Sequence, residues 1–312
     1  MIYGLITAAI ILLIVLVIRF MPKASREGSL VVKNLNSGRL TNLNKIIKSI
    51  NKKAKVVSKF TNTPDTVFVL NFKGNLQATQ VQSLRKEISA ILDFSEINKP
   101  KEVVVNLSSP GGTVTGYGLA AAQLERLRKA EIPLTVCVDQ VAASGGYKMA
   151  VVANKIISAP YAIIGSIGVV MEMPNFSSLL KKVGIEYTQY TAGEHKRLVS
   201  PFVPPETKAV EKTKEKLVDT HKLFIEHIKY FRPQINAEEV CTGETWYGKE
   251  ALKKNLVDEI NTSDDYLREL GKSNRIIQLE FKIPEKVSRK ISLGVSHILS
   301  DLFDKIFEKY NY

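Results

Sequence analysis

Short apolar runs alternate with amphipathic stretches along the first half of the chain. The runs at 66–72, 103–107 and 133–138 are apolar enough to be buried strands. Between them, 78–94 and 116–130 carry apolar residues at helical spacing. The apolar face of the first of these helices consists of Val81, Leu84, Ile88, Ile91 and Leu92. Strands that alternate with helices predict an α/β fold.

The second half of the chain continues with longer amphipathic patterns. Residues 206–231 predict a long amphipathic helix, a short helix follows 242–248, and 186–190 is strand-like. The tail is also strongly amphipathic, with apolar positions at Ile291, Val295, Ile298, Leu299, Leu302, Phe303, Ile306, Phe307 and Tyr310. This C-terminal helix predicts docking on its own domain or on a neighbouring subunit, and a membrane-surface helix is the alternative.

The amino terminus predicts a membrane anchor. Residues 2–18 contain no charge and consist mainly of Ile, Leu, Val and Ala, and with Phe20 and Met21 the run reaches the length that spans a bilayer. No basic segment precedes the run and no small-residue cleavage site follows it. We therefore expect an uncleaved transmembrane helix rather than a removed signal peptide, and a buried N-terminal helix is the alternative.

The segment after the anchor is basic. Residues 22–63 mix Lys and Arg with Asn and Ser, and apolar residues recur there at helical spacing, which suits a linker or a peripheral helix on anionic headgroups. The net charge of the chain is +13, but no nucleic-acid motif accompanies it. The expected organisation is an anchor at 1–21, a basic linker at 22–63, a catalytic domain at 64–270 and an amphipathic tail at 271–312.

The stretch 141–147, Val-Ala-Ala-Ser-Gly-Gly-Tyr, carries the main candidate for chemistry. It places Ser144 between a predicted buried strand and a predicted buried helix. At a helix N-terminus, unpaired N–H groups and the positive end of the dipole can hold a developing oxyanion beside the hydroxyl. Ser144 is therefore a candidate nucleophile, and an ordinary N-cap serine is the alternative.

Three further segments bear on that choice. Residues 106–112, Asn-Leu-Ser-Ser-Pro-Gly-Gly, suit an oxyanion hole or a peptide groove, or else an ordinary turn. In the apolar run 163–170, Ser166 is able to hydrogen-bond a buried amine, and a tight turn between core strands is the alternative. Lys196 follows a Gly-containing loop, where a desolvated lysine can act as the base for a serine. His195 is the competing base, because the chain's other histidines lie on predicted helices.

Together these segments resemble the signal peptide peptidase A family of membrane-bound serine peptidases, and within it the half-length SohB-type branch. The resemblance rests on the ordered motifs at 109–112, 141–147, 164–169, 193–196 and 247–260. It implies that Ser144 is the nucleophile, Lys196 the general base and Ser166 the residue that orients the lysine, with oxyanion donors at Gly111 and the N–H of Gly145. Gly111 and Gly112 would also border the substrate groove.

The resemblance further implies a ClpP/crotonase-type fold of repeated β-β-α units and a serine endopeptidase without metal or cofactor. Its expected substrates are remnant signal peptides and other membrane-derived or unfolded segments, bound in extended conformation by strand addition along Gly111–Gly112. The expected partners are the lipid bilayer and further copies of the chain in a homo-oligomer, with an octamer as the expected size. Nucleic acid is not an expected partner.

Two questions stay open at this point. The chain is expected in a bacterial-type cytoplasmic (inner) membrane as a single-pass protein, but the basic residues after Ile18 place that side in the cytoplasm, whereas the resemblance places the catalytic domain on the outer face. The rival functions are an acyl-CoA enzyme of the crotonase type, which also uses a glycine-rich oxyanion hole, and a non-catalytic membrane scaffold.

Overall fold

The computed structural model describes residues 29–35, 65–193, 196 and 198–282. Residues 31–280 form one compact unit that contains almost all of them. The expected anchor at 1–21, most of the basic linker and the amphipathic helix of the tail lie outside the described residues. Within the described ranges, no helix combines the length and the apolar character needed to cross a membrane.

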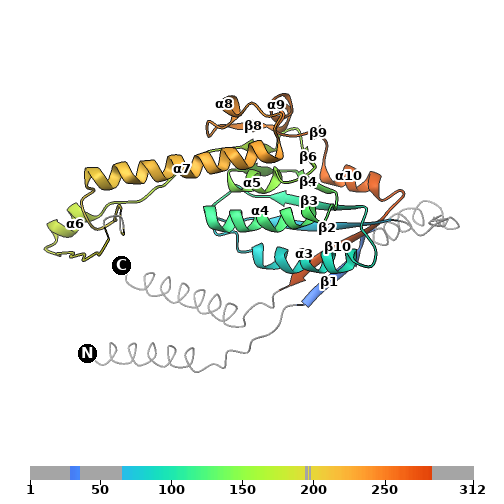
Figure 1. Ribbon diagram of the computed structural model, residues 1–312, viewed down its shortest axis with the longest axis horizontal. Helices are drawn as coiled ribbons and strands as arrows, with labels where there is room; N and C mark the ends of the chain where they lie inside the picture. Colours follow the sequence, from blue (N-terminus) through green and yellow to red (C-terminus); the bar gives the residue numbers. More distant parts are fainter. Residues whose placement is uncertain (1–28, 36–64, 194–195, 197, 283–312) are drawn as a thin grey trace, which may run out of the picture. The chain divides into compact units, whose positions relative to one another are not determined.

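A seven-stranded sheet forms the centre of this unit, with the strand order β1-β10-β2-β3-β4-β6-β9 (Figure 1). Its strands are β1 (Ser29–Asn34), β2 (Thr66–Lys73), β3 (Glu102–Ser108), β4 (Leu134–Val138), β6 (Lys155–Ser158), β9 (Glu259–Ile260) and β10 (Arg275–Lys282). All pairs from β10 to β9 are parallel. The carboxyl ends of β2, β3 and β4 therefore lie along one edge of the sheet.

Helices cover both faces of this sheet. On one face, α3 (Val81–Ser95) and α4 (Val114–Lys129) pack on Phe68, Leu70 and Val105 within the larger core cluster. On the other face, Val67 and Val69 belong to a smaller cluster with Leu267 of α10 (Ser263–Leu270). Because side chains alternate along a strand, neighbouring residues of β2 enter different clusters. Burial on both faces explains why the parallel strands are continuous apolar runs.

A small second sheet leads directly into Ser144 and Ser166. It contains β5 (Val141–Ala143), β7 (Ile163–Gly165) and β8 (Thr245–Tyr247), with β5 parallel and β8 antiparallel to β7. The remaining helices of the described chain are α5 (Gly145–Ala150), α6 (Ser177–Lys182), α7 (Thr207–Phe231), α8 (Ala237–Val240) and α9 (Gly248–Lys253). The end of β3 joins β5, because Ser109 N–H donates to Val141 O at 2.8 Å and Ala143 N–H donates to Ser109 O at 3.0 Å.

The prediction of an α/β fold is confirmed. The expected strands at 66–72, 103–107 and 133–138 correspond to β2, β3 and β4, and the expected helix at 206–231 is α7. The expected strand at 186–190 is wrong, because these residues form no strand and their side chains are exposed without a neighbouring strand. β1 and β10 come from segments in which the apolar pattern predicted no strand.

A partly buried ion pair joins the end of α7 to the sheet. Arg232 Nη2 lies 2.7 Å from Asp258 Oδ1, and the Arg232 side chain is only 3% exposed. Asp258 Oδ2 also accepts the Ile156 N–H of β6 at 2.7 Å. Burial alone would raise the pKa of the Asp258 carboxyl, but hydrogen bonds from Arg232 and Ile156 outweigh it and hold that pKa below its usual range. The pair therefore stabilises the fold at neutral pH, and its contribution is lost as the pH falls through this lowered pKa.

We expect Asp258→Asn to lower the free energy of unfolding by about 2–3 kcal/mol at pH 7, because it leaves the buried Arg232 charge uncompensated. The matched control is Glu259→Gln. Glu259 pairs with Lys155 at 2.6 Å, but both side chains are more than a third exposed, so its loss costs less than about 1 kcal/mol. Urea unfolding of both variants measures the difference, and equal losses would contradict the role assigned to Arg232–Asp258.

Candidate active site

Ser144 occupies a sharp turn between β5 and α5. Its backbone angles are φ 51° and ψ −119°, in a region that residues with a side chain rarely adopt. Such a conformation costs about 1–3 kcal/mol and persists only where the surroundings impose it. Here Ser144 N–H donates to Gly165 O of β7 at 2.7 Å, and Ser144 O accepts the Lys148 N–H of α5 at 2.9 Å. Both polar backbone groups of the serine are thus fixed by neighbouring elements.

Glycines allow the loop after β3 to run directly against this turn. A Cβ on Gly111, whose φ is +95°, would lie 2.7 Å from Ser144 Cβ and 2.9 Å from Gly145 N. A Cβ on Gly145 would lie 2.4 Å from Cγ of Tyr117, and one on Gly146 would lie 2.6 Å from Ser109 O. These distances are too short for any side chain. Glycine at these three positions therefore allows the turn at Ser144 to pack closely against the loop after β3 and against Tyr117 of α4.

A series of hydrogen bonds links the loop after β3 to Tyr117 of α4 and to Asn75. Gly111 N–H donates to Ser109 Oγ at 3.1 Å, Ser109 Oγ lies 2.5 Å from Tyr117 Oη, and Tyr117 O–H donates to Asn75 O at 2.8 Å. Since Tyr117 has one proton to give, Ser109 donates to Tyr117. Burial raises the pKa of the Tyr117 hydroxyl, and the Ser109 hydrogen bond opposes this only in part, so the tyrosine stays protonated.

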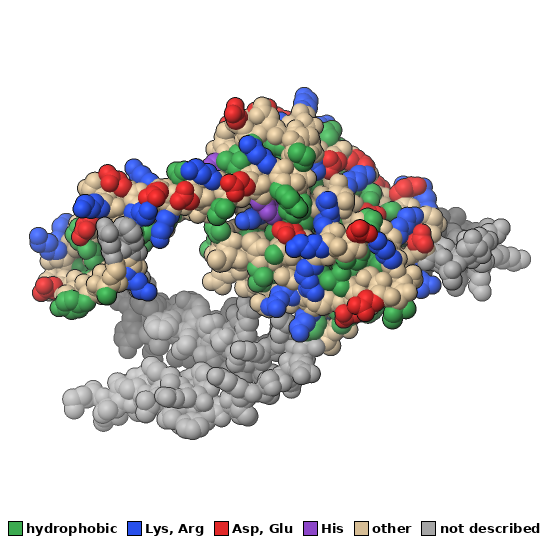
Figure 2. Space-filling model, in the orientation of Figure 1, with side chains coloured by type: hydrophobic (Ala, Val, Ile, Leu, Met, Phe, Trp, Pro, Cys, Tyr) green, Lys and Arg blue, Asp and Glu red, His purple; other side chains and the backbone are tan. Residues whose placement is uncertain are grey.

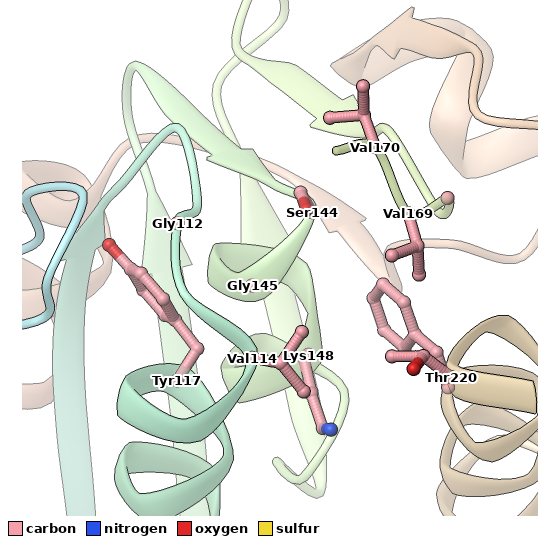
Figure 3. Close-up of a pocket in the computed structure, with 11 residues that line it drawn as sticks. Gly112, Val114, Tyr117, Ser144, Gly145, Lys148, Val169, Val170 and Thr220 are labelled. Atoms are coloured by element: carbon pink, nitrogen blue, oxygen red, sulfur yellow. The ribbon is translucent and has the colours of Figure 1, made fainter. Parts of the chain in front are cut away.

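The pocket beside Ser144 has a volume of about 90 Å³, well below the roughly 300–1,000 Å³ of sites for drug-sized ligands, and is sized for one side chain (Figure 3). Its lining residues are Gly112, Val114, Tyr117, Ser144, Gly145, Lys148, Gly168, Val169, Val170, Thr220 and Phe224. The first N–H groups of α5 have no acceptor within their helix. The pocket therefore combines a hydroxyl, a helix N-terminus and apolar walls.

The structure gives the oxyanion candidates different surroundings. Gly145, directly after Ser144, lines the pocket. Gly111 does not line it, and its N–H is engaged by Ser109 Oγ. Gly112, which was expected only in the substrate groove, does line the pocket. Of the two glycines after Pro110, Gly112 is therefore the one that lines the pocket.

Lys196 and Ser166 are not brought to the pocket in this structure. Lys196 is exposed, its N–H donates to Gly193 O at 3.1 Å, and it is absent from the pocket lining. Ser166 has a positive φ of 51° and gives its N–H to Glu244 O at 2.6 Å. It directly follows Gly165, which binds the Ser144 N–H, but its side chain does not line the pocket. The roles of Lys196 and Ser166 stay predictions.

Two histidines near the site are engaged by backbone carbonyls. His221 Nε2 lies 3.2 Å from Ile167 O, and His227 Nε2 lies 3.0 Å from Lys148 O. A carbonyl oxygen only accepts, so both ring nitrogens donate. Burial lowers the pKa of His227, and its hydrogen bond to Lys148 O opposes that effect. Neither histidine lines the pocket, and His195 lies outside the described residues.

Lys148 is a pocket residue that the sequence analysis did not find. It follows Ser144 by four residues, so the first turn of α5 presents both on the same side. Its side chain is half-buried, and its Nζ lies 5.7 Å from the ring centroid of Phe224. Burial lowers the pKa of the Lys148 ammonium, whereas the charge of Glu125 acts in the opposite direction. The helical spacing from Ser144 is the signal that could have identified it.

The contact between Gly145 and Tyr117 gives a test of the packing behind the turn. We expect Gly145→Ala to destabilise the protein by about 2–3 kcal/mol and to suppress reaction of Ser144 with a fluorophosphonate, because the new methyl overlaps the Tyr117 ring. Gly118→Ala in α4 is the control. Its Cβ meets nothing within 4 Å, so it should be neutral or gain up to about 1 kcal/mol. Thermal unfolding and probe labelling measure both, and unchanged stability of the Gly145→Ala variant would refute the contact.

Comparison with known proteins assigns almost the whole chain to one family. Residues 2–124 match the model of the N-terminal region of peptidase family S49, and residues 126–276 match the model of peptidase family S49 itself. A probable protease SohB of Buchnera aphidicola subsp. Acyrthosiphon pisum is 47% identical over 251 residues, covering 80% of this chain and 74% of the relative.

A second sequence relative and one solved structure were also matched. A probable protease SohB of Haemophilus influenzae is 45% identical over 224 residues, covering 72% of this chain and 63% of the relative. Among solved structures, a membrane-bound stomatin-specific protease, determined as a mutant in complex with a substrate peptide, matches with 14% identity and a TM-score of 0.45, covering 76% of this chain and all of that chain. The sequence matches confirm the resemblance drawn from the motifs: the chain belongs to peptidase family S49 and is a serine peptidase similar to the SohB proteases.

Proposed function

We propose that the protein is a membrane-anchored serine endopeptidase in which Ser144 is the nucleophile and Lys196 the general base. The observation that carries the proposal is the position of Ser144, which is held at a positive φ at the N-terminus of α5 and lines a pocket of side-chain size. A nucleophile at a strained strand-to-helix turn exposes its hydroxyl beside unpaired helix N–H groups. An ordinary N-cap serine explains neither the strain nor the pocket.

The reaction would proceed through an acyl-enzyme. An uncharged Lys196 takes the Ser144 proton as the hydroxyl attacks the peptide carbonyl, and it then gives the proton to the leaving amine before water releases the acyl group. Lys196 must approach Ser144 Oγ to about 3 Å for this step, and catalytic contacts are commonly looser in unliganded proteins. Ser166 would orient the lysine amine in that arrangement.

The N–H groups of Gly145 and of the Gly111–Gly112 loop would hold the oxyanion. Gly145 is supported by its place at the start of α5. In the loop, Gly112 is better supported than Gly111, since Gly111 N–H already binds Ser109 Oγ and Gly112 lines the pocket. An oxyanion donor of this kind contributes about 3–4 kcal/mol to transition-state stabilisation.

The proposed substrates are extended polypeptide segments, among them remnant signal peptides and other membrane-derived or unfolded chains. The pocket beside Ser144 would hold one side chain, and the Gly111–Gly112 edge would pair with the peptide backbone. The motif set supports a ClpP/crotonase-type arrangement of the catalytic domain.

We also propose a homo-oligomer, with an octamer as the expected size. The homo-oligomer is supported by the exposed rings of Phe176, Tyr187 and Phe202, which contact one another near α6. Figure 2 shows apolar side chains on the surface in this region.

The dyad predicts distinct effects for three substitutions. Ser144→Ala should abolish hydrolysis of a fluorogenic peptide, and Lys196→Met should lower kcat by at least about 10³-fold, because each removes one member of the nucleophile–base pair. His195→Ala is the matched control and should retain activity within a few-fold. An inactive His195→Ala together with an active Lys196→Met would transfer the base role to the histidine.

The membrane proposal has its own test. Deleting residues 1–21 should move the protein from the membrane fraction to the supernatant, because it removes the apolar run long enough to span a bilayer. Deleting residues 287–312 is the control and should leave the protein in the membrane fraction. Retention after the first deletion would refute the anchor, and protease treatment of intact spheroplasts would show on which side the catalytic domain lies.

A further inference from the structure

We propose, on the basis of the proposed peptidase function, that Lys148 makes the pocket selective for a substrate side chain that carries a carboxylate. The side chain concerned belongs to the residue on the amino side of the scissile bond. The pocket is bounded by Ser144, Gly145 and Gly112, so a carbonyl carbon under attack by Ser144 brings its own residue's side chain to the pocket entrance. The recognised chemistry is a glutamate-like side chain in an extended peptide.

The Lys148 charge is positioned to recognise the end group of a substrate side chain, away from the scissile bond. Ser144 and Lys148 line the same pocket, and they are separated by one turn of α5. In Figure 3 the Lys148 nitrogen points away from the Ser144 hydroxyl, toward the other end of the pocket. The ammonium is therefore placed to meet the end of a bound side chain rather than the proton of Ser144.

The Lys148 ammonium is not neutralised within the part of the chain that the structure describes. There it forms no ion pair and no hydrogen bond, and its recorded contact is with the face of Phe224 at 5.7 Å from the ring centroid. Glu125 acts on it only through space. By contrast, Lys155 and Lys254 each pair with a glutamate. A half-buried ammonium without a carboxylate has lost part of its water shell, and an incoming anion offsets that loss.

The remaining walls favour a long acidic side chain over a short one. Val114, Val169 and Phe224 supply apolar surface to the same pocket as the ammonium. Methylene groups can lie against such walls while a charged end group reaches the lysine. The volume of about 90 Å³ admits one side chain. Glutamate meets these conditions better than aspartate, and a lysine side chain would face a like charge.

The test uses the full-length protein in detergent and a series of fluorogenic peptides that differ only at the residue before the scissile bond. This residue is Glu, Gln, Leu or Lys. Wild-type kcat/KM should be about tenfold higher for the Glu peptide than for its Gln isostere, because a hydrogen bond to a charged group is of that strength, and lowest for the Lys peptide. Equal kcat/KM values for the Glu and Gln peptides would overturn the proposal without any variant.

Substitution of Lys148 should change the ratios between peptides. In Lys148→Met the Glu:Gln ratio of kcat/KM should fall to about one, and in Lys148→Glu the Lys peptide should become better than the Glu peptide. Lys129→Met is the control, since Lys129 is an exposed residue at the end of α4 and its substitution removes the same charge outside the pocket. Ratios that stay unchanged in both Lys148 variants, or the same shift in Lys129→Met, would overturn the proposal.

Two outcomes separate this inference from the function on which it rests. If wild type cleaves the peptides and Ser144 reacts with a fluorophosphonate, but Glu and Gln peptides are equivalent, only the selectivity is wrong. If wild type cleaves none of the peptides and Ser144 is not labelled, the proposed peptidase function itself fails. A uniform loss of all four activities in Lys148→Met, with a wild type that shows no charge preference, would assign Lys148 to the chemistry instead.

Discussion

The strained backbone of Ser144 is the constraint on which the rest of the site depends. A serine at φ 51° is unfavourable unless neighbouring elements impose it. β7 binds its N–H, α5 binds its carbonyl, and the glycine loop after β3 packs against its Cβ. The small second sheet is needed for this purpose, since β5 and β7 set the entry angle of the chain and Gly165 supplies the acceptor.

A buried polar chain connects this turn to the large sheet. Tyr117 of α4 is fully buried and links Asn75, which follows β2, to Ser109, which follows β3. Ser109 in turn binds Gly111 N–H through its side chain and Ala143 N–H through its carbonyl. These hydrogen bonds hold the loop after β3 at both its side chains and its backbone, so this loop has little freedom to shift. The carboxyl ends of two parallel strands thereby position the turn that holds Ser144.

The sequence predicted the features that depend on local pattern. The apolar runs of β2, β3 and β4 and the motif around Ser144 are visible without a structure, because burial on both faces and sharp turns leave local signatures. β10 was not foreseen, because its partner β2 lies far earlier in the chain and pairing over such a distance leaves no local signal. The segment 186–190 has strand-like residues but no strand beside it, so propensity alone misled there.

The site was also predictable only in part, because the sequence shows local turns but not which distant residues meet. Ser144, Gly145 and Gly112 are adjacent in sequence to the turns that position them, and they meet in one pocket. The pocket's charged residue, Lys148, lies four residues after Ser144, but only the structure showed that both line one pocket. Lys196 was predicted from the resemblance and lies exposed in the single chain, so its approach to Ser144 depends on an arrangement that peptide binding or assembly would have to supply.

The most direct test of this account is a crystal structure of the full-length protein after reaction with a peptidyl phosphonate. The account predicts phosphorus bonded to Ser144 Oγ, a phosphonyl oxygen at Gly145 N–H, and Lys196 Nζ within hydrogen-bond distance of Ser144 Oγ. An adduct on another residue, or an adduct on Ser144 with Lys196 still exposed and a different base beside the oxygen, would contradict it.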